Sequence, residues 1–220
     1  LIGELAGIPQ ALQGKKVLYL APLVALASTK YEEFKNYYEP LGLKVGLRIG
    51  GSRIYVKNEL RLPQEGPLSE AQIIVGTYEG VDFLLRSRPT LLQEVGLIIV
   101  DEIQTIDEAE RGPTLDGLIV RLRAHFPHVQ LLALSATMGN PAELAAELDL
   151  DLVALDGRPV PLEEHVIIAL TEQDKIRHML HLVTEEWATR DPQTKLRGQT
   201  IIFTNSRKKA QRIATTLARH

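Results

Sequence analysis

The segment from Val95 to Gln104 constrains the fold of this chain most strongly. It begins with an almost unbroken apolar run up to Val100, and Asp101 and Glu102 follow that run directly. A run without polar alternation is typical of a strand that is covered on both faces, as in a parallel sheet with helices on either side. In such sheets ligands gather at the carboxyl ends of the strands. We therefore predict an α/β fold in which these two acids lie at a functional edge.

The two carboxylates have a chemical and a structural interpretation. Asp101 offers hard oxygen ligands that suit Mg²⁺, directly or through water, and Glu102 could orient and deprotonate an attacking water molecule. The alternative is that the loop after the strand is merely polar and that both acids are solvated. The rest of the chain has to decide between these interpretations.

Strand and helix patterns alternate over the first 155 residues, which predicts a parallel α/β sheet. Apolar runs that favour strands occupy residues 17–21, 44–49, 71–76, 95–100 and 129–134. Residues 52–70 are polar, contain Pro63, Gly66 and Pro67, and predict a surface excursion.

Two helices are expected near the start of the chain, each with an apolar face. Helical spacing relates the apolar residues of the first helix, which are Leu1, Leu5, Ile8 and Leu12. The second helix follows Pro22, and its expected apolar face comprises Leu23, Leu26, Ala27, Phe34 and Tyr38. A further helix should start at Asn140, where Asn, Pro and Glu143 form a typical helix beginning.

A change of composition at residues 156–161 marks a domain boundary. The sequence there is Asp-Gly-Arg-Pro-Val-Pro, which suits an extended linker. We expect a first domain over residues 1–155, a linker over 156–165 and the beginning of a second domain over 166–220. In that second part we predict strands at 166–170 and 200–204 and helices around 174–188 and from 206.

Composition excludes several classes of protein. Cysteine is absent, which excludes disulfides and thiolate metal sites and makes a cytoplasmic protein the default. No apolar run approaches the roughly 20 residues that cross a membrane. The net charge of −3 combines about +5 over residues 165–220 with about −8 over the rest. Nucleic acid would therefore have to be bound through local contacts rather than through bulk positive charge.

Five short segments follow one another along the chain, at residues 21–30, 76–79, 101–104, 135–137 and 201–205. In this order and at similar spacing, they resemble motifs Ia, Ib, II, III and IV of superfamily 2 helicases. The resemblance is strongest to the Ski-like DExH group, which residues 110–112 and 158–160 also resemble.

The resemblance assigns roles in ATP hydrolysis to five residues. Asp101 corresponds to the acid that holds magnesium, and Glu102 to the acid that activates water. Gln104 takes the fourth position of motif II, where His is common in the group. Ser135 and Thr137 match motif III, whose hydroxyls couple the nucleotide site to the nucleic-acid path.

The resemblance also implies contacts to the backbone of a single strand of nucleic acid. The physics agrees, because small residues and hydroxyls at strand ends let backbone amides reach phosphates without reading bases. Alternatively, Thr77 could serve only as a helix cap. Arg207 could instead belong to a basic face that is merely solvated. The candidate contacts are Pro22, Gly51, Thr77, Tyr78, Thr204 and Arg207.

The resemblance implies an α/β RecA-like domain and the start of a second one, in an ATP-dependent helicase or translocase that uses ATP and Mg²⁺ on single-stranded DNA or RNA. The family's Gly-rich phosphate loop and its arginine finger have no counterpart in these residues. We therefore expect that the working polypeptide is longer and that this chain alone hydrolyses no ATP. The alternative is a non-catalytic nucleic-acid-binding or scaffold fragment with a helicase-like fold.

Overall fold

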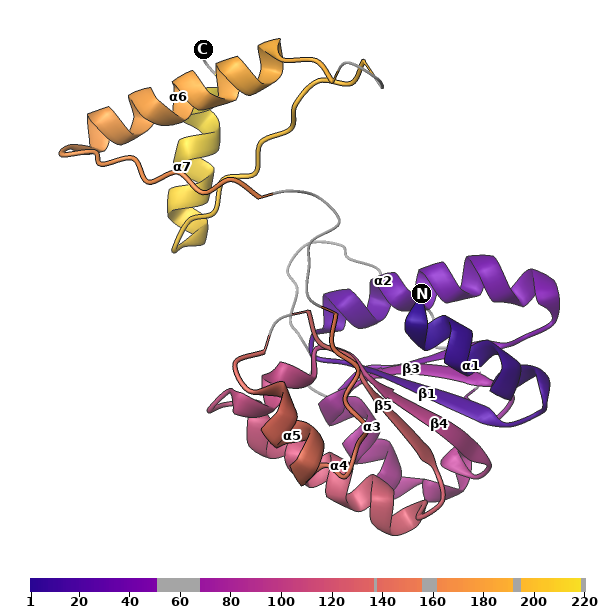
Figure 1. Cartoon of the computed structure of the whole chain (residues 1–220). Helices are drawn as coiled ribbons and strands as arrows, with labels where there is room; N and C mark the ends of the chain where they lie inside the picture. The colour runs from indigo at the N-terminus through magenta and orange to yellow at the C-terminus, as the bar shows by residue number, and fades with distance from the viewer. Residues whose placement is uncertain (51–67, 137, 156–161, 192–194, 219–220) are drawn as a thin grey trace. The chain divides into compact units, whose positions relative to one another are not determined.

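A computed structural model describes the chain except for residues 51–67, 137, 156–161, 192–194 and 219–220 (Figure 1). Gly51, Thr137, most of the expected surface excursion and residues 156–161 of the expected linker therefore lie outside the described part. The chain divides into two compact units, Leu1–Ala154 and Leu155–His220.

The first unit contains a five-stranded, fully parallel sheet, which confirms the predicted α/β fold. The strand order is β2-β3-β1-β4-β5, so β1 lies in the centre and β5 at one edge of the described sheet. The strands are β1 (Lys16–Ala21), β2 (Val45–Arg48), β3 (Ile73–Thr77), β4 (Val95–Val100) and β5 (Gln130–Ala133).

Helices cover both faces of this sheet, and the strands are therefore mainly apolar, with polar residues only at their ends (Figure 1). Alternate residues of β1 belong to different cores: Leu18 and Leu20 pack with α3 and α4, whereas Tyr19 and Ala21 pack with α1 and α2. The helices of this unit are α1 (Ile2–Leu12), α2 (Val24–Tyr38), α3 (Tyr78–Ser87), α4 (Gly112–His125) and α5 (Pro141–Glu147). Short 3₁₀ turns are η1 (Glu39–Leu41), η2 (Pro89–Leu92) and η3 (Ile103–Asp107).

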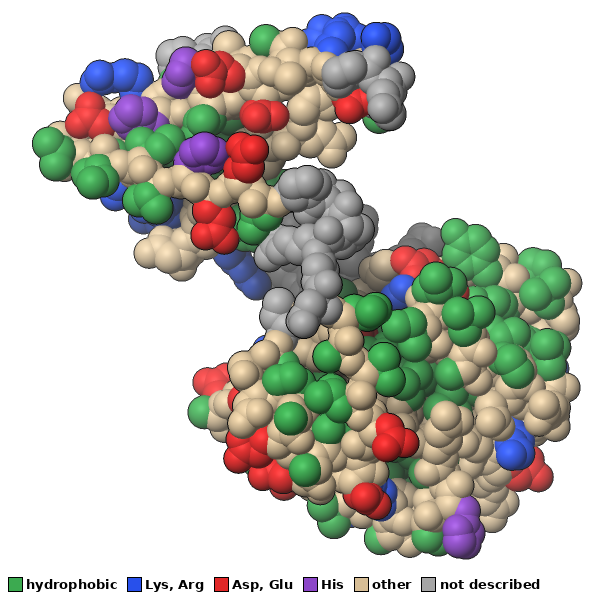
Figure 2. Space-filling model, in the orientation of Figure 1, with side chains coloured by type: hydrophobic (Ala, Val, Ile, Leu, Met, Phe, Trp, Pro, Cys, Tyr) green, Lys and Arg blue, Asp and Glu red, His purple; other side chains and the backbone are tan. Residues whose placement is uncertain are grey.

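Helix α1 packs against the sheet through a different face from the predicted one. Its buried residues are Gly3, Gly7 and Ala11, while Leu1 and Leu5 are 84% and 67% exposed. A Cβ added to Gly7 would lie 3.2 Å from Val17, so the absence of side chains lets the helix approach β1 closely. The leucines instead contribute to the hydrophobic surface over α1 in Figure 2.

The predicted apolar face of α2 is correct in part. Ala27 and Phe34 are buried, as expected, and Tyr31 joins them. Leu23 and Leu26, at the start of the helix, are 48% and 41% exposed instead, and Tyr38 is only partly buried. Core membership at a helix end depends on what lies opposite, which helical spacing alone does not report.

The second unit contains two helices, α6 (Glu172–Ala188) and α7 (Arg207–Leu217), both close to the predicted positions. The strands predicted at 166–170 and 200–204 are wrong: both segments are irregular, and most of their apolar side chains are exposed. Two strands are too few for a stable sheet, and these apolar segments have no strand ladder within the described unit.

Among the described residues, no helix combines the length and apolar character needed to span a membrane.

Candidate nucleotide and nucleic-acid site

The acids Asp101 and Glu102 lie where the carboxyl end of β4 turns into η3. The turn is held from both sides, because Asp101 N donates to Leu20 O at 2.9 Å and Ile103 N donates to Leu134 O at 2.9 Å. The first carbonyl belongs to β1 and the second to the residue that directly follows β5, and these two strands flank β4. The predicted position of the acids at the carboxyl edge of the sheet is therefore what the structure shows.

Glu102 has a backbone conformation that is rare for a residue with a side chain. Its φ of +54° lies in the left-handed region, which costs about 1–2 kcal/mol for an L-residue. Strain of this kind is found at functional sites where the surroundings hold the residue in place. Here the hydrogen bonds on either side of Glu102 provide that hold.

The Asp101 carboxylate receives one donor on each oxygen. Tyr19 Oη donates to Oδ2 at 2.5 Å, and Glu102 N donates to Oδ1 at 3.1 Å. A third donor, Tyr78 Oη, reaches the carbonyl oxygen of Asp101 at 2.6 Å. Burial, together with the neighbouring Asp101 carboxylate, raises the pKa of Tyr19 well above its ordinary value, so this hydroxyl keeps its proton.

Glu102 is linked to Ser135 through Gln104. Gln104 Nε2 donates to Glu102 Oε2, and Ser135 Oγ donates to Gln104 Oε1 at 2.8 Å. An amide can make both contacts because it carries a donor and an acceptor. Gln104 therefore joins the loop after β4 to the loop after β5, although His is common at this position in the group that the sequence resembles.

The donor set at this edge fits Mg²⁺ in the way that nucleotide sites use it. Asp101 and Glu102 are half-buried carboxylates, and no group of three or more His, Cys, Asp or Glu suited to a metal ion occurs among the described residues. Magnesium is commonly held by one or two carboxylates, water molecules and substrate phosphates rather than by an all-protein cage. Asp101 is the residue that would hold it.

Three of the candidate strand contacts are buried in the first unit. Thr77 caps α3, because its Oγ1 accepts from Gly80 N at 3.2 Å, and it also accepts from Gly50 N at 3.1 Å. Thr77 therefore acts as a helix cap, and its contact with a nucleic-acid strand stays a prediction. Tyr78 is fully buried, with its hydroxyl on motif II. Pro22 is also buried, and its carbonyl accepts a 3.5 Å hydrogen bond from Arg111 Nη1.

The remaining described candidates, Thr204 and Arg207, belong to the second unit. Thr204 Oγ1 donates to Ser206 O at 3.0 Å, and Ser206 caps α7 by accepting from Lys209 N at 3.2 Å. Arg207 is exposed at the first residue of that helix.

Two residues at the site, Tyr19 and Arg111, were not predicted from the sequence. Tyr19 could have been found because it is a hydroxyl-bearing residue inside the apolar run 17–21. Arg111 lies in the Glu-Arg-Gly segment, and it bridges Glu108 at 2.7 Å and the Pro22 carbonyl. The contact of Tyr19 with Asp101 and that of Arg111 with Pro22 could not be predicted, because each joins residues more than 80 positions apart in the sequence.

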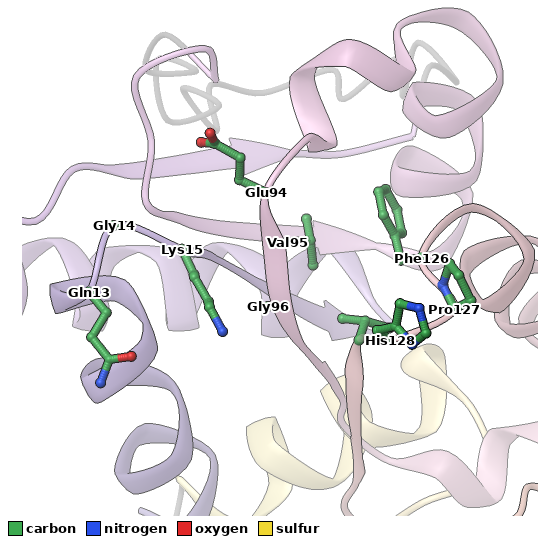
Figure 3. A pocket seen from close by; sticks show the side chains of 10 residues that line it. Gln13, Gly14, Lys15, Glu94, Val95, Gly96, Phe126, Pro127 and His128 are labelled. Carbon is green, nitrogen blue, oxygen red and sulfur yellow. The ribbon is translucent and has the colours of Figure 1, made fainter.

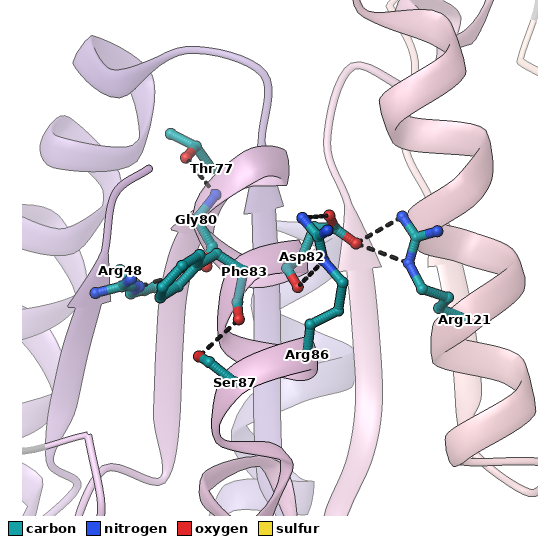
Figure 4. Close-up of polar contacts among 8 residues, drawn as sticks. All are labelled: Arg48, Thr77, Gly80, Asp82, Phe83, Arg86, Ser87 and Arg121. Atoms are coloured by element: carbon teal, nitrogen blue, oxygen red, sulfur yellow. Dashed lines mark hydrogen bonds and ion pairs between the residues drawn. The ribbon is translucent and has the colours of Figure 1, made fainter. Parts of the chain in front are cut away.

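A buried carboxylate ties α3 to α4 below the site (Figure 4). Asp82 contacts Arg121 on α4 through Nε at 2.8 Å and Nη2 at 2.6 Å, and Arg86 Nη2 lies 2.6 Å from its other oxygen. Beside it, the Arg48 guanidinium stacks over the Phe83 ring at 5.2 Å. These contacts hold α3, whose first turn follows Thr77, against the rest of the unit.

A hollow of about 550 Å³ lies at the opposite edge of the sheet, near the starts of β1, β4 and β5 (Figure 3). It contains no residue of the five motifs. Its lining residues are Gln13, Gly14, Lys15, Glu94, Val95, Gly96, Phe126, Pro127, His128 and Val129.

Comparison with known proteins agrees with this geometry. The profile of the DEAD/DEAH box helicase family matches residues 2–144. The chain is 48% identical over 218 residues to a probable ATP-dependent helicase of Methanocaldococcus jannaschii, covering 99% of this chain and 26% of that protein.

Two further relatives are described as the ATP-dependent DNA helicase Hel308. The one from Pyrobaculum calidifontis is 36% identical over 226 residues, and the one from Methanocella arvoryzae is 34% identical over 226 residues. All of this chain is covered in both cases, but only 30% and 29% of the relatives. The chain thus spans less than a third of the length of these proteins. With the family profile matching well over half of its residues, the chain belongs to the DEAD/DEAH box helicase family.

Proposed function

We propose that this chain is the core of an ATP-dependent helicase or translocase that acts on single-stranded nucleic acid as part of a longer polypeptide. The observation that carries the proposal is the arrangement of motif II. Asp101 and Glu102 lie at the carboxyl end of a buried strand, and Gln104 links Glu102 to Ser135 of motif III. Each unit would then supply part of one RecA-like domain, the first over residues 1–155 and the second from residue 166.

In the proposed mechanism each residue of the site has a separate task. ATP with Mg²⁺, when bound, supplies the phosphoryl group whose transfer to water is favourable. Asp101 holds the metal, directly or through water, and Glu102 accepts the proton of the attacking water. Gln104 orients Glu102 and connects it to Ser135, so that a change at the nucleotide site reaches the loop after β5.

The proposal places the strand along the carboxyl edge of the sheet. The Thr77 side chain caps α3 by accepting from Gly80 N. In this proposal the strand's phosphates are bound by other main-chain N–H groups in the first turn of α3, which have no partner within the helix. Pro22, Gly51, Thr204 and Arg207 remain candidate strand contacts from the motif resemblance, and Thr137 remains the second hydroxyl of motif III. Tyr78 stays a candidate contact as well, although its ring is buried and its hydroxyl donates to the Asp101 carbonyl of motif II.

We also propose a helicase group, a nucleic-acid type and a cellular location for this protein. The Ski-like DExH group is favoured by the Glu-Arg-Gly segment at 110–112 and by Arg-Pro-Val at 158–160. Relatives described as DNA helicases favour DNA over RNA. A cytoplasmic location is favoured by the absence of cysteine.

The test is an ATPase assay on the complete polypeptide that carries this chain, with and without single-stranded DNA or RNA. We expect hydrolysis that requires Mg²⁺ and is stimulated by single strands. Binding of single strands without any hydrolysis would support the alternative, a non-catalytic nucleic-acid-binding or scaffold protein. Stimulation by RNA alone would overturn the preference for DNA.

A further inference from the structure

We propose that Tyr19 and Tyr78 are positioning residues for Asp101, which hold its carboxylate and its main chain in the orientation that receives the divalent cation. This inference rests on the proposed role of Asp101. Neither tyrosine would touch nucleotide or metal, because both side chains are buried beside Asp101.

An aspartate carboxylate needs help to keep one orientation. Rotation about its terminal bond is soft, because such torsions have broad, two-fold energy profiles. Glu102 N holds one oxygen at 3.1 Å, but this contact comes from the adjacent residue and is local to the turn. Tyr19 Oη holds the other oxygen at 2.5 Å from a different strand, so rotating the carboxylate would break a contact to the sheet. Each oxygen keeps acceptor capacity for water or a cation.

Tyr19 is itself fixed. It lies on the central strand β1, which pairs with β3 on one side and β4 on the other. Its side chain is 5% exposed, and its ring packs edge-on against Phe34 with centroids 5.4 Å apart. A donor on a rigid element positions its acceptor more narrowly than one on a loop does.

The hydroxyl of Tyr19 is unnecessary for packing. The core around it consists of the apolar residues of β1–β4 and α2, where a phenylalanine would fill the same space. Burying a hydroxyl costs free energy unless a hydrogen bond compensates. Asp101 provides that bond, so the hydroxyl serves the site rather than the core.

Tyr78 acts on the same residue from the other side. It begins α3, directly after the helix cap Thr77, and its hydroxyl reaches the Asp101 carbonyl at 2.6 Å. The second carbonyl of the turn, that of Glu102, lies 3.5 Å from the same oxygen. Tyr78 therefore supports the left-handed turn at Glu102, while Tyr19 holds the carboxylate that precedes it.

The test compares Tyr19→Phe with Tyr38→Phe in the complete polypeptide. Tyr38 is a matched control, since it also packs on Phe34, at 5.6 Å, and its hydroxyl also donates to a carboxylate, Glu4, at 2.8 Å. Two readouts are needed. The first is the Mn²⁺ dissociation constant in the presence of ADP, from electron paramagnetic resonance of free Mn²⁺. The second is the Mg²⁺ concentration that half-saturates the ATPase.

We expect Tyr19→Phe to raise both values about ten-fold, the lower end of the range for residues that orient a metal ligand. The KM for ATP at saturating Mg²⁺ should change less than about two-fold, and Tyr38→Phe should change neither metal readout. Tyr78→Phe should raise the Mn²⁺ dissociation constant in the same direction. If Tyr19→Phe does not fold, the Tyr78→Phe variant tests the proposal by itself. An unchanged Mn²⁺ dissociation constant in Tyr78→Phe would then overturn the positioning role.

Equal metal readouts for Tyr19→Phe and Tyr38→Phe would overturn the positioning role and leave the helicase proposal intact. Absence of ATPase activity in the wild-type polypeptide would instead overturn the proposed function. The Mn²⁺ comparison distinguishes the two failures, because it does not depend on turnover.

Discussion

Replacing Asp82 by Ala tests how strongly the contacts in Figure 4 hold the first unit together. The Asp82 side chain is 8% exposed, whereas those of Arg121 and Arg86 are 39% and 65% exposed. Breaking a fully buried pair costs about 3–5 kcal/mol, mainly because a charge is left buried and unpaired. Exposed pairs contribute only about 0–1 kcal/mol.

The expected cost lies between these limits. Both guanidinium groups can regain water once Asp82 is gone, so most of the penalty for an unpaired buried charge is avoided. What is lost is the two-pronged contact with Arg121, whose charged hydrogen bonds contribute about 1.5–3 kcal/mol. We therefore expect Asp82→Ala to lower the free energy of unfolding by about 2 kcal/mol, or the melting temperature by about 4–8 °C.

Urea unfolding of the chain, followed by circular dichroism, measures this effect. Arg86→Ala is the matched control, since Arg86 is itself 65% exposed and its pair with Asp82 lies within one helix, so the substitution should cost less than about 0.5 kcal/mol. Arg121→Ala should cost clearly more, because it disconnects α3 from α4. The reasoning is refuted if Asp82→Ala stays within about 0.5 kcal/mol of wild type, or if both arginine variants cost the same.

Three further predictions concern the site and its surroundings. Glu102→Gln should reduce ATP hydrolysis by the complete polypeptide about 10²–10⁴-fold while nucleotide binding persists, the range for a general base; unchanged turnover in a single-turnover assay would exclude that role. Gln104→Ala should reduce the rate of ATP hydrolysis about ten-fold or more, because the charged Glu102 loses its hydrogen bond. Ser135→Ala should reduce that rate less, since Ser135 contacts Glu102 only through Gln104. A larger loss of rate in Ser135→Ala than in Gln104→Ala would contradict the proposed link. Burial and the hydrogen bond to Glu4 raise the pKa of Tyr38 to about 12, so the stability that Tyr38 contributes is complete below pH 10 and lost as pH rises toward 12. The stability difference between wild type and Tyr38→Phe, from urea midpoints, should shrink over that window and not below it.

Much of the first unit could be predicted from local sequence patterns. The run from Val95 to Val100 predicted β4, because a run without polar alternation is typical of a strand covered on both faces. The acids after it had to lie at the carboxyl edge of a parallel sheet. Tyr78 shows the limit of the same reasoning: its motif suggested the nucleic-acid path, whereas packing turns its hydroxyl toward Asp101.

The predictions were wrong where the structure of a segment depends on the element that packs against it. The leucines of α1 have helical spacing, but the sheet accepts the glycine face because the helix can approach β1 more closely there. Residues 166–170 and 200–204 have strand composition, but a strand needs a neighbour with which to form hydrogen bonds. Neither outcome is encoded in the segment itself.

Local patterns were enough to predict the α/β class, the parallel strands of the first unit and the position of Asp101 and Glu102 at their carboxyl edge, because periodicity and chain order are local properties. The hydrogen bond between Tyr19 and Asp101, 82 residues apart, and the link from Glu102 through Gln104 to Ser135 exist only in the folded chain. Such contacts depend on strand order and register, which place residues side by side that no sequence spacing relates. The residue types of the site could be recognised in the sequence, whereas the hydrogen bonds that orient their side chains arise from tertiary packing.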